Sequence, residues 1–212
     1  MPHRTYLHPY RESHARHGSA FEVTLWNSPQ SQAARFQAFT EMRFLAGKRI
    51  LDAGCSRGDL ATYLFSRHIP LGRYIGIDAL PEVLSFARTR PELAGQPCEF
   101  HAGDLLTEPE LFALGHPQII IISGTLNTMT PADALSFLAH AWRHTSEALL
   151  FNFLSDRCGP QAPAQAPPAR RLPTLPLLDW ALQQTPQISF RQDYFPHGHD
   201  ATILMSKPRG KS

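Results

Sequence analysis

Two glycines and three aspartates stand where a chain can hold a small organic ligand. Within the stretch DAGCSRGD, Gly54 and Gly58 bound a short loop that follows Asp52 closely. Glycine has no Cβ, so such a loop can turn sharply and let a ligand lie against its backbone. Asp78 and Asp104 follow two later apolar runs. Carboxylates at these places suit the hydroxyls of a ribose and the exocyclic amine of a base such as adenine.

The glycine spacing excludes one common nucleotide site. A nicotinamide or flavin dinucleotide needs the pattern G-x-G-x-x-G, which lets its pyrophosphate approach the loop. Here the spacing is G-x-x-x-G, with Ser56 at the middle position and Leu60 and Ala61 beyond the loop. A plain structural turn is the alternative for the loop by itself. The aspartates at the ends of two later runs favour a binding site over such a turn.

The chain that carries these residues alternates between apolar strands and short helices. We expect parallel strands at residues 49–53, 73–78, 98–104, 118–124 and 148–155, with helices at 60–68, 81–90, 109–115, 131–145 and 174–185. Four consecutive isoleucines from Ile119 to Ile122 indicate a strand that is buried on both faces. Such alternation predicts an α/β fold with helices on both faces of a parallel sheet. Ligands bind such sheets at the carboxyl ends of the strands, where the candidate residues stand.

The flanking segments complete one domain. Residues 1–27 lack clear periodicity and are interpreted as an arm or lid, and residues 28–212 as the domain itself. Ser28 and Pro29 predict the start of an amphipathic helix that stops at Gly47. The proline-rich stretch 159–173 cannot form a helix or a central strand and predicts a loop. The stretches 187–196 and 200–207 alternate enough to form an antiparallel pair that closes the sheet.

The order of these elements resembles that of one family. Its pattern is D-x-G-x-G-x-G after the first strand, with an acidic residue ending the second strand and another after the third. The matching segments here are ILDAGCSRGDLATYL, YIGIDALPEVLSFAR, FHAGDLL and IIIISGTLN, and with the closing hairpin they cover about Gly47 to Lys207. The sequence thus resembles the class I S-adenosylmethionine-dependent methyltransferases. Ser56 stands where the family most often has glycine, so it should show a glycine-like φ or a locally shifted loop.

The resemblance implies a Rossmann-like, doubly wound seven-stranded sheet with the order 3-2-1-4-5-7-6 and an antiparallel last strand. It also implies that S-adenosylmethionine is the cofactor and S-adenosylhomocysteine the product. Asp52 and the glycine loop would hold the methionine portion, Asp78 the ribose and Asp104 the adenine. The N-terminal segment is similar to the lid of a small-molecule branch of the family, which brings Arg35 toward the cofactor carboxylate. The expected cofactor-binding residues are Asp52, Gly54, Cys55, Ser56, Gly58, Asp78, Ala79, Gly103, Asp104, Leu105, Ser123, Gly124 and Arg35.

The methyl acceptor is expected to be an oxygen or nitrogen atom of a small or medium-sized metabolite. Methyl transfer needs little side-chain chemistry, because catalysis can rest on holding the nucleophile in line with the methyl group. His17, Tyr194 and His197 are the candidate catalytic residues, since a histidine poised near neutral pH suits proton removal. Trp26 and Asn127 are the candidate contacts to the acceptor. Solvated histidines and a core tryptophan are the plain alternatives.

Composition and charge limit the partners. The 212 residues are 42% hydrophobic and 18% charged, and 20 basic against 18 acidic side chains leave a net charge of +2. This balance argues against a nucleic acid or an anionic membrane as the partner. Three scattered cysteines, and histidines without carboxylates at ligand spacing, argue against a disulfide framework or a metal site. Without an apolar leader or membrane-spanning stretch we expect a cytoplasmic protein, and the sequence leaves its oligomeric state open.

Two alternatives to a small-molecule methyltransferase stay open. A binding or scaffold protein would keep the fold without turnover. The stretch SGTLNTM after the fourth strand contains no Asn/Asp-Pro-Pro-aromatic motif, on which amino-group methyltransferases of DNA bases or glutamine rely. An RNA or protein methyltransferase would be favoured by a basic face built from Arg4, Arg11, Arg16, Arg170, Arg171 and the basic tail.

Overall fold

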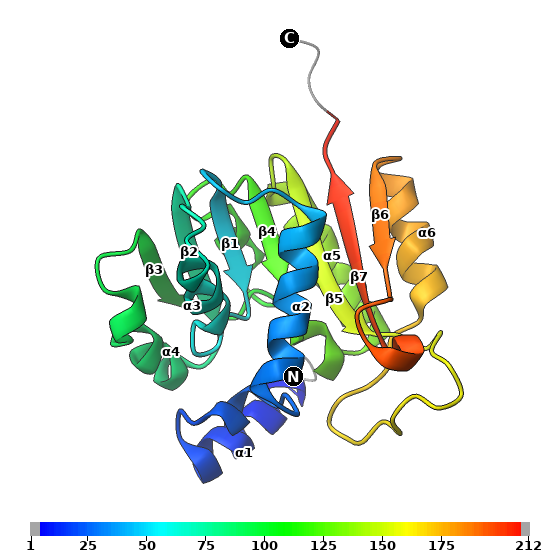
Figure 1. The fold of residues 1–212 in the computed structure, drawn as a ribbon, viewed down its shortest axis with the longest axis horizontal. Coiled ribbons are helices and arrows are strands. Elements are labelled where there is room, and N and C mark those ends of the chain that lie inside the picture. Colours follow the sequence, from blue (N-terminus) through cyan, green and yellow to red (C-terminus); the bar gives the residue numbers. More distant parts are fainter. Residues whose placement is uncertain (1–4, 209–212) are drawn as a thin grey trace.

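Within residues 5–208, which the computed structural model describes, seven strands form one mixed sheet (Figure 1). The strands are β1 (Arg49–Ala53), β2 (Arg73–Asp78), β3 (Cys98–Ala102), β4 (Ile119–Ile122), β5 (Ala148–Leu154), β6 (Ile188–Arg191) and β7 (Asp200–Ser206). Their spatial order is β3-β2-β1-β4-β5-β7-β6. Strands β1 to β5 pair in parallel, and β7 runs antiparallel to β5 and β6. The predicted doubly wound order and its antiparallel strand are therefore confirmed.

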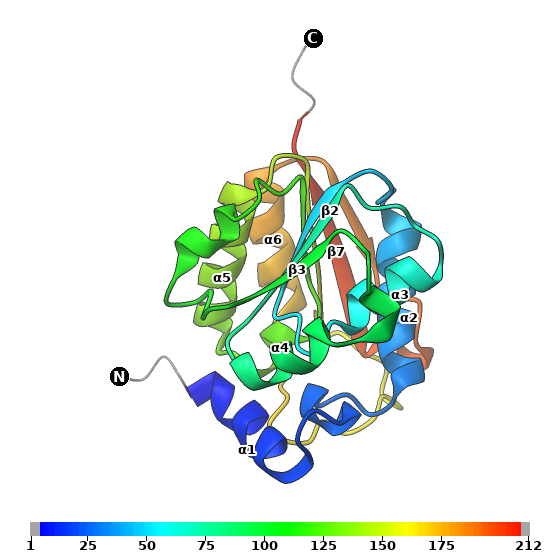
Figure 2. The ribbon, with the colours of Figure 1, turned by 90° about the vertical axis from the view of Figure 1, so that its left-hand side faces the viewer.

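Helices cover both faces of this sheet. The α-helices are α1 (His8–His17), α2 (Pro29–Met42), α3 (Asp59–Ser66), α4 (Pro81–Arg88), α5 (Pro131–His144) and α6 (Thr174–Gln184). Figure 2 shows α2 and α3 on one face and α5 and α6 on the other. The short helix expected at 109–115 is instead a 3-10 turn, Pro109–Ala113. Five residues between a proline and a glycine are too few for α-helical hydrogen bonding to propagate.

The sheet separates two hydrophobic cores. Ile119 and Ile121 of β4 pack into the core beneath α2 and α3, whereas Ile120 and Ile122 pack into the core beneath α5 and α6. All four side chains are fully buried. Successive side chains of a strand point to opposite faces, so this alternation is the expected result of covering a strand on both sides. The interpretation of the isoleucine run is confirmed.

The N-terminal segment is more ordered than its lack of periodicity suggests. It contains α1, which lies across the edge of the sheet where β1 and β4 end (Figures 1 and 2). The sequence of α1, HPYRESHARH, is polar and has no apolar stripe, so nearly all of its side chains keep contact with solvent. The segment is anchored instead by Tyr6, Leu7 and Val23, which are buried in the same core as Ile77 and Leu105. The division of the chain after residue 27 stays a prediction.

The proline-rich loop is tied down by one arginine. Arg171 donates hydrogen bonds to the carbonyl oxygens of Ser155 (2.9 Å), Pro163 (2.8 Å) and His199 (3.2 Å). The loop forms no helix or strand over residues 159–171, as its prolines predict. Arg171 thus fixes an irregular segment against the β6–β7 hairpin.

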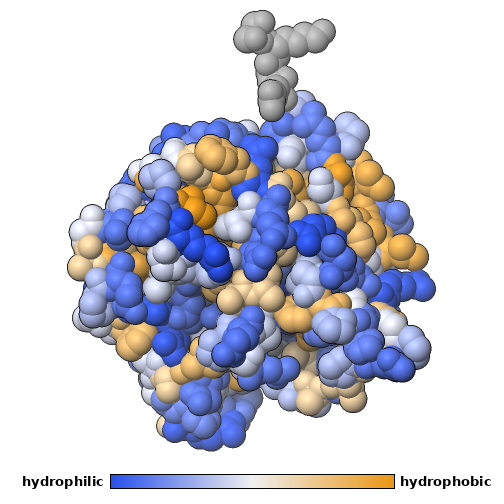
Figure 3. Space-filling view, viewed as in Figure 1, coloured by the Kyte–Doolittle hydropathy of each residue, from blue (hydrophilic) through white to orange (hydrophobic). Residues whose placement is uncertain are grey.

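The far edge of the sheet carries exposed apolar side chains. Leu175 and Leu182 of α6 and Phe190 of the edge strand β6 are exposed, and hydrophobic surface appears on that side of the face in Figure 3.

In residues 5–208, no helix combines the length and the apolar character that crossing a membrane requires.

Helix α2 begins at a side-chain cap, as its sequence predicts. The hydroxyl of Ser28 accepts a hydrogen bond from the backbone N–H of Ser31 at 3.1 Å, and Pro29 occupies the first helical position. The cap satisfies one of the free N–H groups at the helix start. It matters for the site because α2 carries Gln32 and Arg35 toward the strand ends.

We therefore expect Ser28→Ala to lower the free energy of unfolding by about 1 kcal/mol, because the helix loses this cap. Urea unfolding followed by circular dichroism measures the change. Ser28→Asp should retain most of the stability, since aspartate also caps helices well. Equal losses in the two variants would contradict the capping role.

Candidate active site

A cavity of about 350 Å³ lies at the carboxyl ends of the parallel strands. Its walls come from the loop after β1, the residues that follow β2, β3 and β4, the N-terminal segment and the proline-rich loop. The sequence-predicted residues in its lining are Asp52, Gly54, Cys55, Ser56, Asp78, Ala79, Gly103, Leu105, Ser123, Gly124, Arg35, Trp26 and Asn127. Residues that are distant in the sequence therefore meet around one space, as the carboxyl edge of a doubly wound sheet predicts.

The glycine loop has the backbone that its sequence predicts. Gly54 has a φ of 83°, and a Cβ there would lie 2.2 Å from Oγ1 of Thr125, so only glycine fits. Gly58 has a φ of 72° and caps the start of α3. Ser56 has a φ of 46°, in the left-handed region that favours glycine. The predicted glycine-like φ of Ser56 is confirmed.

Asp78 explains why Ser56 adopts that conformation. Its carboxylate accepts hydrogen bonds from the backbone N–H of Ser56 at 2.8 Å and of Leu80 at 2.9 Å. One oxygen thus holds the glycine loop and the other holds the start of α4. Removal from bulk water raises the pKa of Asp78 to about 6, although the two N–H groups favour its charged form. Each oxygen keeps a lone pair for a ligand in the cavity.

Asp52 lies at the end of β1 with almost no exposure to solvent. The hydroxyl of Tyr74 donates a hydrogen bond to its carboxylate. Burial raises the pKa of Asp52 to about 7, and the nearby Asp78 carboxylate adds to the shift. The neighbouring Cys55 is also buried, and burial raises the pKa of its thiol well above the usual value. Cys55 is thus a packed thiol, in keeping with the interpretation that it is not a nucleophile.

Asp104 follows β3 and lies behind the cavity wall, between the lining residues Gly103 and Leu105. Its Oδ1 accepts hydrogen bonds from the Tyr6 hydroxyl at 2.5 Å and from the backbone N–H of Leu106 at 3.1 Å. Its Oδ2 is buried and has no hydrogen-bond partner within residues 5–208. A buried carboxylate oxygen without a partner is costly, which marks a place for a donor from a ligand.

The end of β4 meets the N-terminal segment. Gly124 has a φ of 77°, and a Cβ there would lie 2.4 Å from the ring of Trp26. Its N–H donates to Oδ1 of Asn152, whose amide in turn donates to the hydroxyl of Ser123 at 3.1 Å. Asn127 lines the cavity, but its Oδ1 accepts the N–H of Leu154. Trp26 therefore forms a wall directly over the end of β4.

Arg35 faces the cavity from α2 with its charge already paired. Its guanidinium donates to Asp200 through Nε at 2.7 Å and to the Ser31 carbonyl through Nη1 at 2.7 Å. The rings of Trp26 and Phe195 lie on it, with centroids 4.2 Å and 4.6 Å away. This arrangement holds Arg35 rigidly at the wall. Its contact with a cofactor carboxylate stays a prediction.

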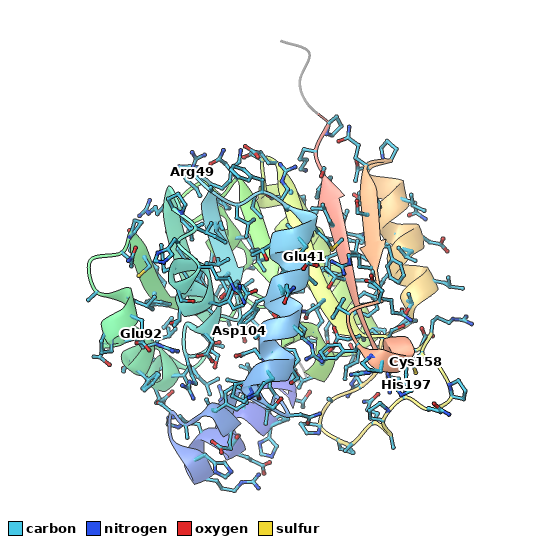
Figure 4. The ribbon with its side chains drawn as sticks, in the orientation of Figure 1. Glu41, Arg49, Glu92, Asp104, Cys158 and His197 are labelled. Carbon is cyan, nitrogen blue, oxygen red and sulfur yellow. The ribbon has the colours of Figure 1, made fainter. Side chains whose placement is uncertain are left out.

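The three candidate catalytic residues lie away from the cavity. As the described residues define it, the lining does not include His17, Tyr194 or His197. His17 is exposed on α1, and Tyr194 donates a hydrogen bond to Asp200 at 2.6 Å. His197 lies exposed in the turn of the β6–β7 hairpin, close to Cys158 and apart from Asp104 (Figure 4). Their positions give a catalytic role no support.

Several residues that line the cavity were not predicted from the sequence. Tyr6 and Tyr10 come from the N-terminal segment, Arg171 from the proline-rich loop, and His199 from the start of the last strand. None belongs to a motif, and only the tertiary fold brings them together. The two tyrosines four residues apart were the one available signal, because residues at this spacing share a helix face.

Groups of three or more His, Cys, Asp or Glu side chains with the arrangement of a metal site do not occur within residues 5–208. The side chains that converge at the strand ends are carboxylates, hydroxyls and aromatic rings.

The raised pKa of Asp52 predicts how stability depends on pH. Its folded-state pKa of about 7 lies above the ordinary value of about 3.9, so the folded state binds this proton more tightly. The stabilisation is complete below about pH 4 and is lost as the pH rises through about 7. Asp52→Asn removes this contribution, so the variant should gain stability over the wild type between those values, by up to about 4 kcal/mol.

Urea unfolding of both proteins across this pH range measures the difference. Asp179→Asn, at an exposed position of α6, is the matched control for removing a carboxylate. A stability difference between wild type and Asp52→Asn that does not change with pH would contradict the assignment.

Comparisons with known proteins agree with this geometry. Residues 50–148 match a family model described as a methyltransferase domain. No curated protein sequence matches the chain. The matched segment runs from β1 to the start of β5 and contains the glycine loop, Asp78 and Asp104.

Solved structures share the fold at low sequence identity. Magnesium protoporphyrin IX methyltransferase from Synechocystis PCC 6803, with bound S-adenosylhomocysteine, is 15% identical over 84% of this chain and 83% of its own, with a TM-score of 0.64. The glycopeptide N-methyltransferase MtfA, complexed with S-adenosylmethionine, is 13% identical over 84% and 94%, with a TM-score of 0.62. The small RNA methyltransferase HEN1 is 15% identical over 87% of this chain but 26% of its own, with a TM-score of 0.69. Residues 50–148 therefore form a methyltransferase domain, and the strand order and the solved structures show that the chain has the fold of the class I S-adenosylmethionine-dependent methyltransferases.

Proposed function

We propose that this methyltransferase transfers the methyl group of S-adenosylmethionine to an oxygen or nitrogen atom of a small or medium-sized metabolite. The observation that carries the proposal is the cover over the strand ends. The N-terminal segment and the proline-rich loop both line the cavity, so the acceptor site is a bounded space and not an open groove. A bounded site holds the two reactants in contact and excludes water.

The cofactor site rests on three carboxylates and the glycine loop. The buried Oδ2 of Asp104 lacks a partner within residues 5–208 and suits the amino group of adenine. The free lone pairs of Asp78 suit the ribose hydroxyls. Asp52 and the backbone of Gly54 and Ser56 are left for the methionine portion. When bound, the cofactor supplies a methyl group on a sulfonium cation, which these carboxylates favour electrostatically.

The acceptor side is apolar and electrically balanced. Trp26 forms its wall over the end of β4, and residues 163–169 of the proline-rich loop lie opposite the sheet. The two arginines of the lining are committed to protein groups, Arg35 to Asp200 and Arg171 to three carbonyl oxygens. A phosphate track needs cations that are free to meet phosphates. The lining therefore favours a neutral or weakly polar acceptor.

His199 is the cavity residue that best suits proton removal. Its ring packs on Phe195, and its Nδ1 is buried with no hydrogen-bond partner within residues 5–208. Burial lowers the pKa of His199, which keeps the imidazole neutral at physiological pH and able to accept a proton. We assign to His199 the role of general base, for which His197, two residues earlier, was a candidate from the sequence.

The RNA or protein alternative depends on a basic face. Arg11 and Arg16 are exposed on α1, and Arg170 is exposed beside the proline-rich loop. Arg171 is held inward by its three carbonyl contacts. Arg4 and the tail from residue 209 onward lie outside the described residues. The likeness to an RNA methyltransferase is one of fold alone, so no specific observation favours this alternative.

Cofactor binding provides the first prediction. Asp78→Asn should weaken S-adenosylmethionine binding about tenfold or more, because hydrogen bonds to a charged acceptor are lost. Wild-type affinity should fall as the pH drops through about 6, where Asp78 takes up a proton. Calorimetric titration measures both effects, with exposed Glu82→Gln on α4 as the control. Undiminished affinity in Asp78→Asn would refute the ribose assignment.

The acceptor class is tested by turnover. The protein is incubated with S-adenosylmethionine and a panel of hydroxyl- and amino-bearing metabolites, and S-adenosylhomocysteine formation is followed. We expect turnover with members of this panel and loss of most of it in His199→Asn. Turnover with RNA or peptide substrates alone, falling steeply with added salt, would refute the small-molecule proposal.

A further inference from the structure

One residue of the N-terminal segment touches the predicted adenine site. The Tyr6 hydroxyl donates a hydrogen bond to Oδ1 of Asp104 at 2.5 Å, across 98 positions of the sequence. Both residues are largely buried, with exposed fractions of 7% for Tyr6 and 6% for Asp104. A hydrogen bond between a hydroxyl and a carboxylate in such surroundings is among the stronger ones in proteins.

The contact leaves the two oxygens of Asp104 in different states. Oδ1 accepts two hydrogen bonds, from Tyr6 and from the N–H of Leu106. Oδ2 is buried and accepts none from residues 5–208. The carboxylate is therefore fixed in orientation with one oxygen committed and the other available. Gly103, Leu105 and Tyr6, which adjoin Asp104, all line the cavity, so this carboxylate lies directly behind the cavity wall.

Tyr6 can act in this way because it stays protonated. Burial, followed by the nearby Asp104 carboxylate, raises the pKa of the Tyr6 hydroxyl far above its usual range. The hydroxyl is thus a hydrogen-bond donor at every physiological pH. Removing it would leave Oδ1 with one donor fewer in a site that water does not reach.

Tyr6 is also the point at which the N-terminal segment is fixed. It directly precedes Leu7 and α1, and both Tyr6 and Leu7 belong to the core beneath the sheet edge. Tyr10, four residues later, lines the same cavity beside Thr128 without contacting Asp104. One of the contacts that hold the N-terminal segment over the strand ends is therefore made to the Asp104 carboxylate, directly behind the cavity wall.

We propose that Tyr6 is a positioning residue for the adenine base of the cofactor. It holds Oδ1 of Asp104 so that Oδ2 accepts the exocyclic amino group, and in doing so it couples the packing of the N-terminal segment to recognition of that base. The inference deepens the proposed function and rests on its assignment of Asp104 to adenine. Specificity for an amino-bearing base thus depends on a residue outside the matched methyltransferase domain.

The test compares two ligands in two proteins. S-adenosylhomocysteine carries the amino group, and S-inosylhomocysteine has a carbonyl oxygen in its place, which a carboxylate repels. We expect the wild type to prefer the amino ligand at least about tenfold in calorimetric titrations. In Tyr6→Phe the preference should shrink about tenfold, mainly through weaker binding of the amino ligand. Equal weakening of both ligands would mean that Tyr6 is only a wall, and would overturn the proposal.

Two further variants locate the effect. Tyr10→Phe removes a hydroxyl from the same segment and should leave the ligand preference unchanged. Asp104→Asn should abolish the preference for the amino ligand. The double variant that also carries Tyr6→Phe should show the same lack of preference, since the two substitutions act through one carboxylate. A preference that Tyr10→Phe reduces as strongly as Tyr6→Phe would also overturn the proposal.

The coupling between α1 and the adenine site can also be measured in the wild-type protein, so the result does not depend on whether a variant folds. Amide hydrogen exchange in α1 should slow more with saturating S-adenosylhomocysteine than with saturating S-inosylhomocysteine, because only the first engages Oδ2 of Asp104. Equal protection by both ligands would overturn the coupling. If the wild type bound neither ligand, the proposed function would fail along with this inference; binding without preference would refute the inference alone.

Discussion

The structure depends on keeping three carboxylates at the ends of three neighbouring parallel strands, where little water reaches them. Each is held by donors that the fold supplies: Asp52 by Tyr74, Asp78 by two backbone N–H groups, and Asp104 by Tyr6 and a backbone N–H. The raised pKa values of Asp52 and Asp78 show that these donors do not fully compensate for burial. The site is therefore strained electrostatically in a way that a cationic ligand relieves. A sulfonium ion is such a ligand.

Two arginines tie the segments that cover the cavity to the rest of the fold. Arg35 of α2 joins Asp200 of β7, and Arg171 joins the proline-rich loop to the hairpin. A buried ion pair adds little stability by itself, but losing one partner leaves a buried charge and is strongly destabilising. The contacts of Arg35 and Arg171 therefore serve mainly to fix the positions of the segments that they join. They bring α2, the loop and the last strand to one edge of the sheet.

The sheet, its order and the glycine loop could be predicted because each has a periodic or positional signal. Alternating runs reveal the strands, and a glycine-like φ at Ser56 was expected because Ser56 stands where the resembling family most often has glycine. The covering segments carry no such signal. Helix α1 is polar on nearly all sides, so its anchor, Tyr6, is invisible without the fold. His197 was predicted as a candidate base from its place in the hairpin, but it is exposed, and the cavity residue is His199. The sequence of a turn does not reveal which of its side chains face inward.

The contrast between the predictable strand ends and the unpredictable covering segments follows from what methyl transfer requires. The sulfonium of S-adenosylmethionine is reactive enough that positioning alone supplies much of the rate, so the proposed function needs little beyond the cofactor contacts that it assigns to the strand ends. The proposed function assigns selection of the acceptor to the cavity walls, which include Trp26 and the proline-rich loop. Both belong to segments outside the sheet, so they can change without disturbing it. Tyr6 is the exception, because it stands in a covering segment and yet touches a strand-end carboxylate. Through that contact, the proposed adenine site and the segment that bounds the cavity share one carboxylate.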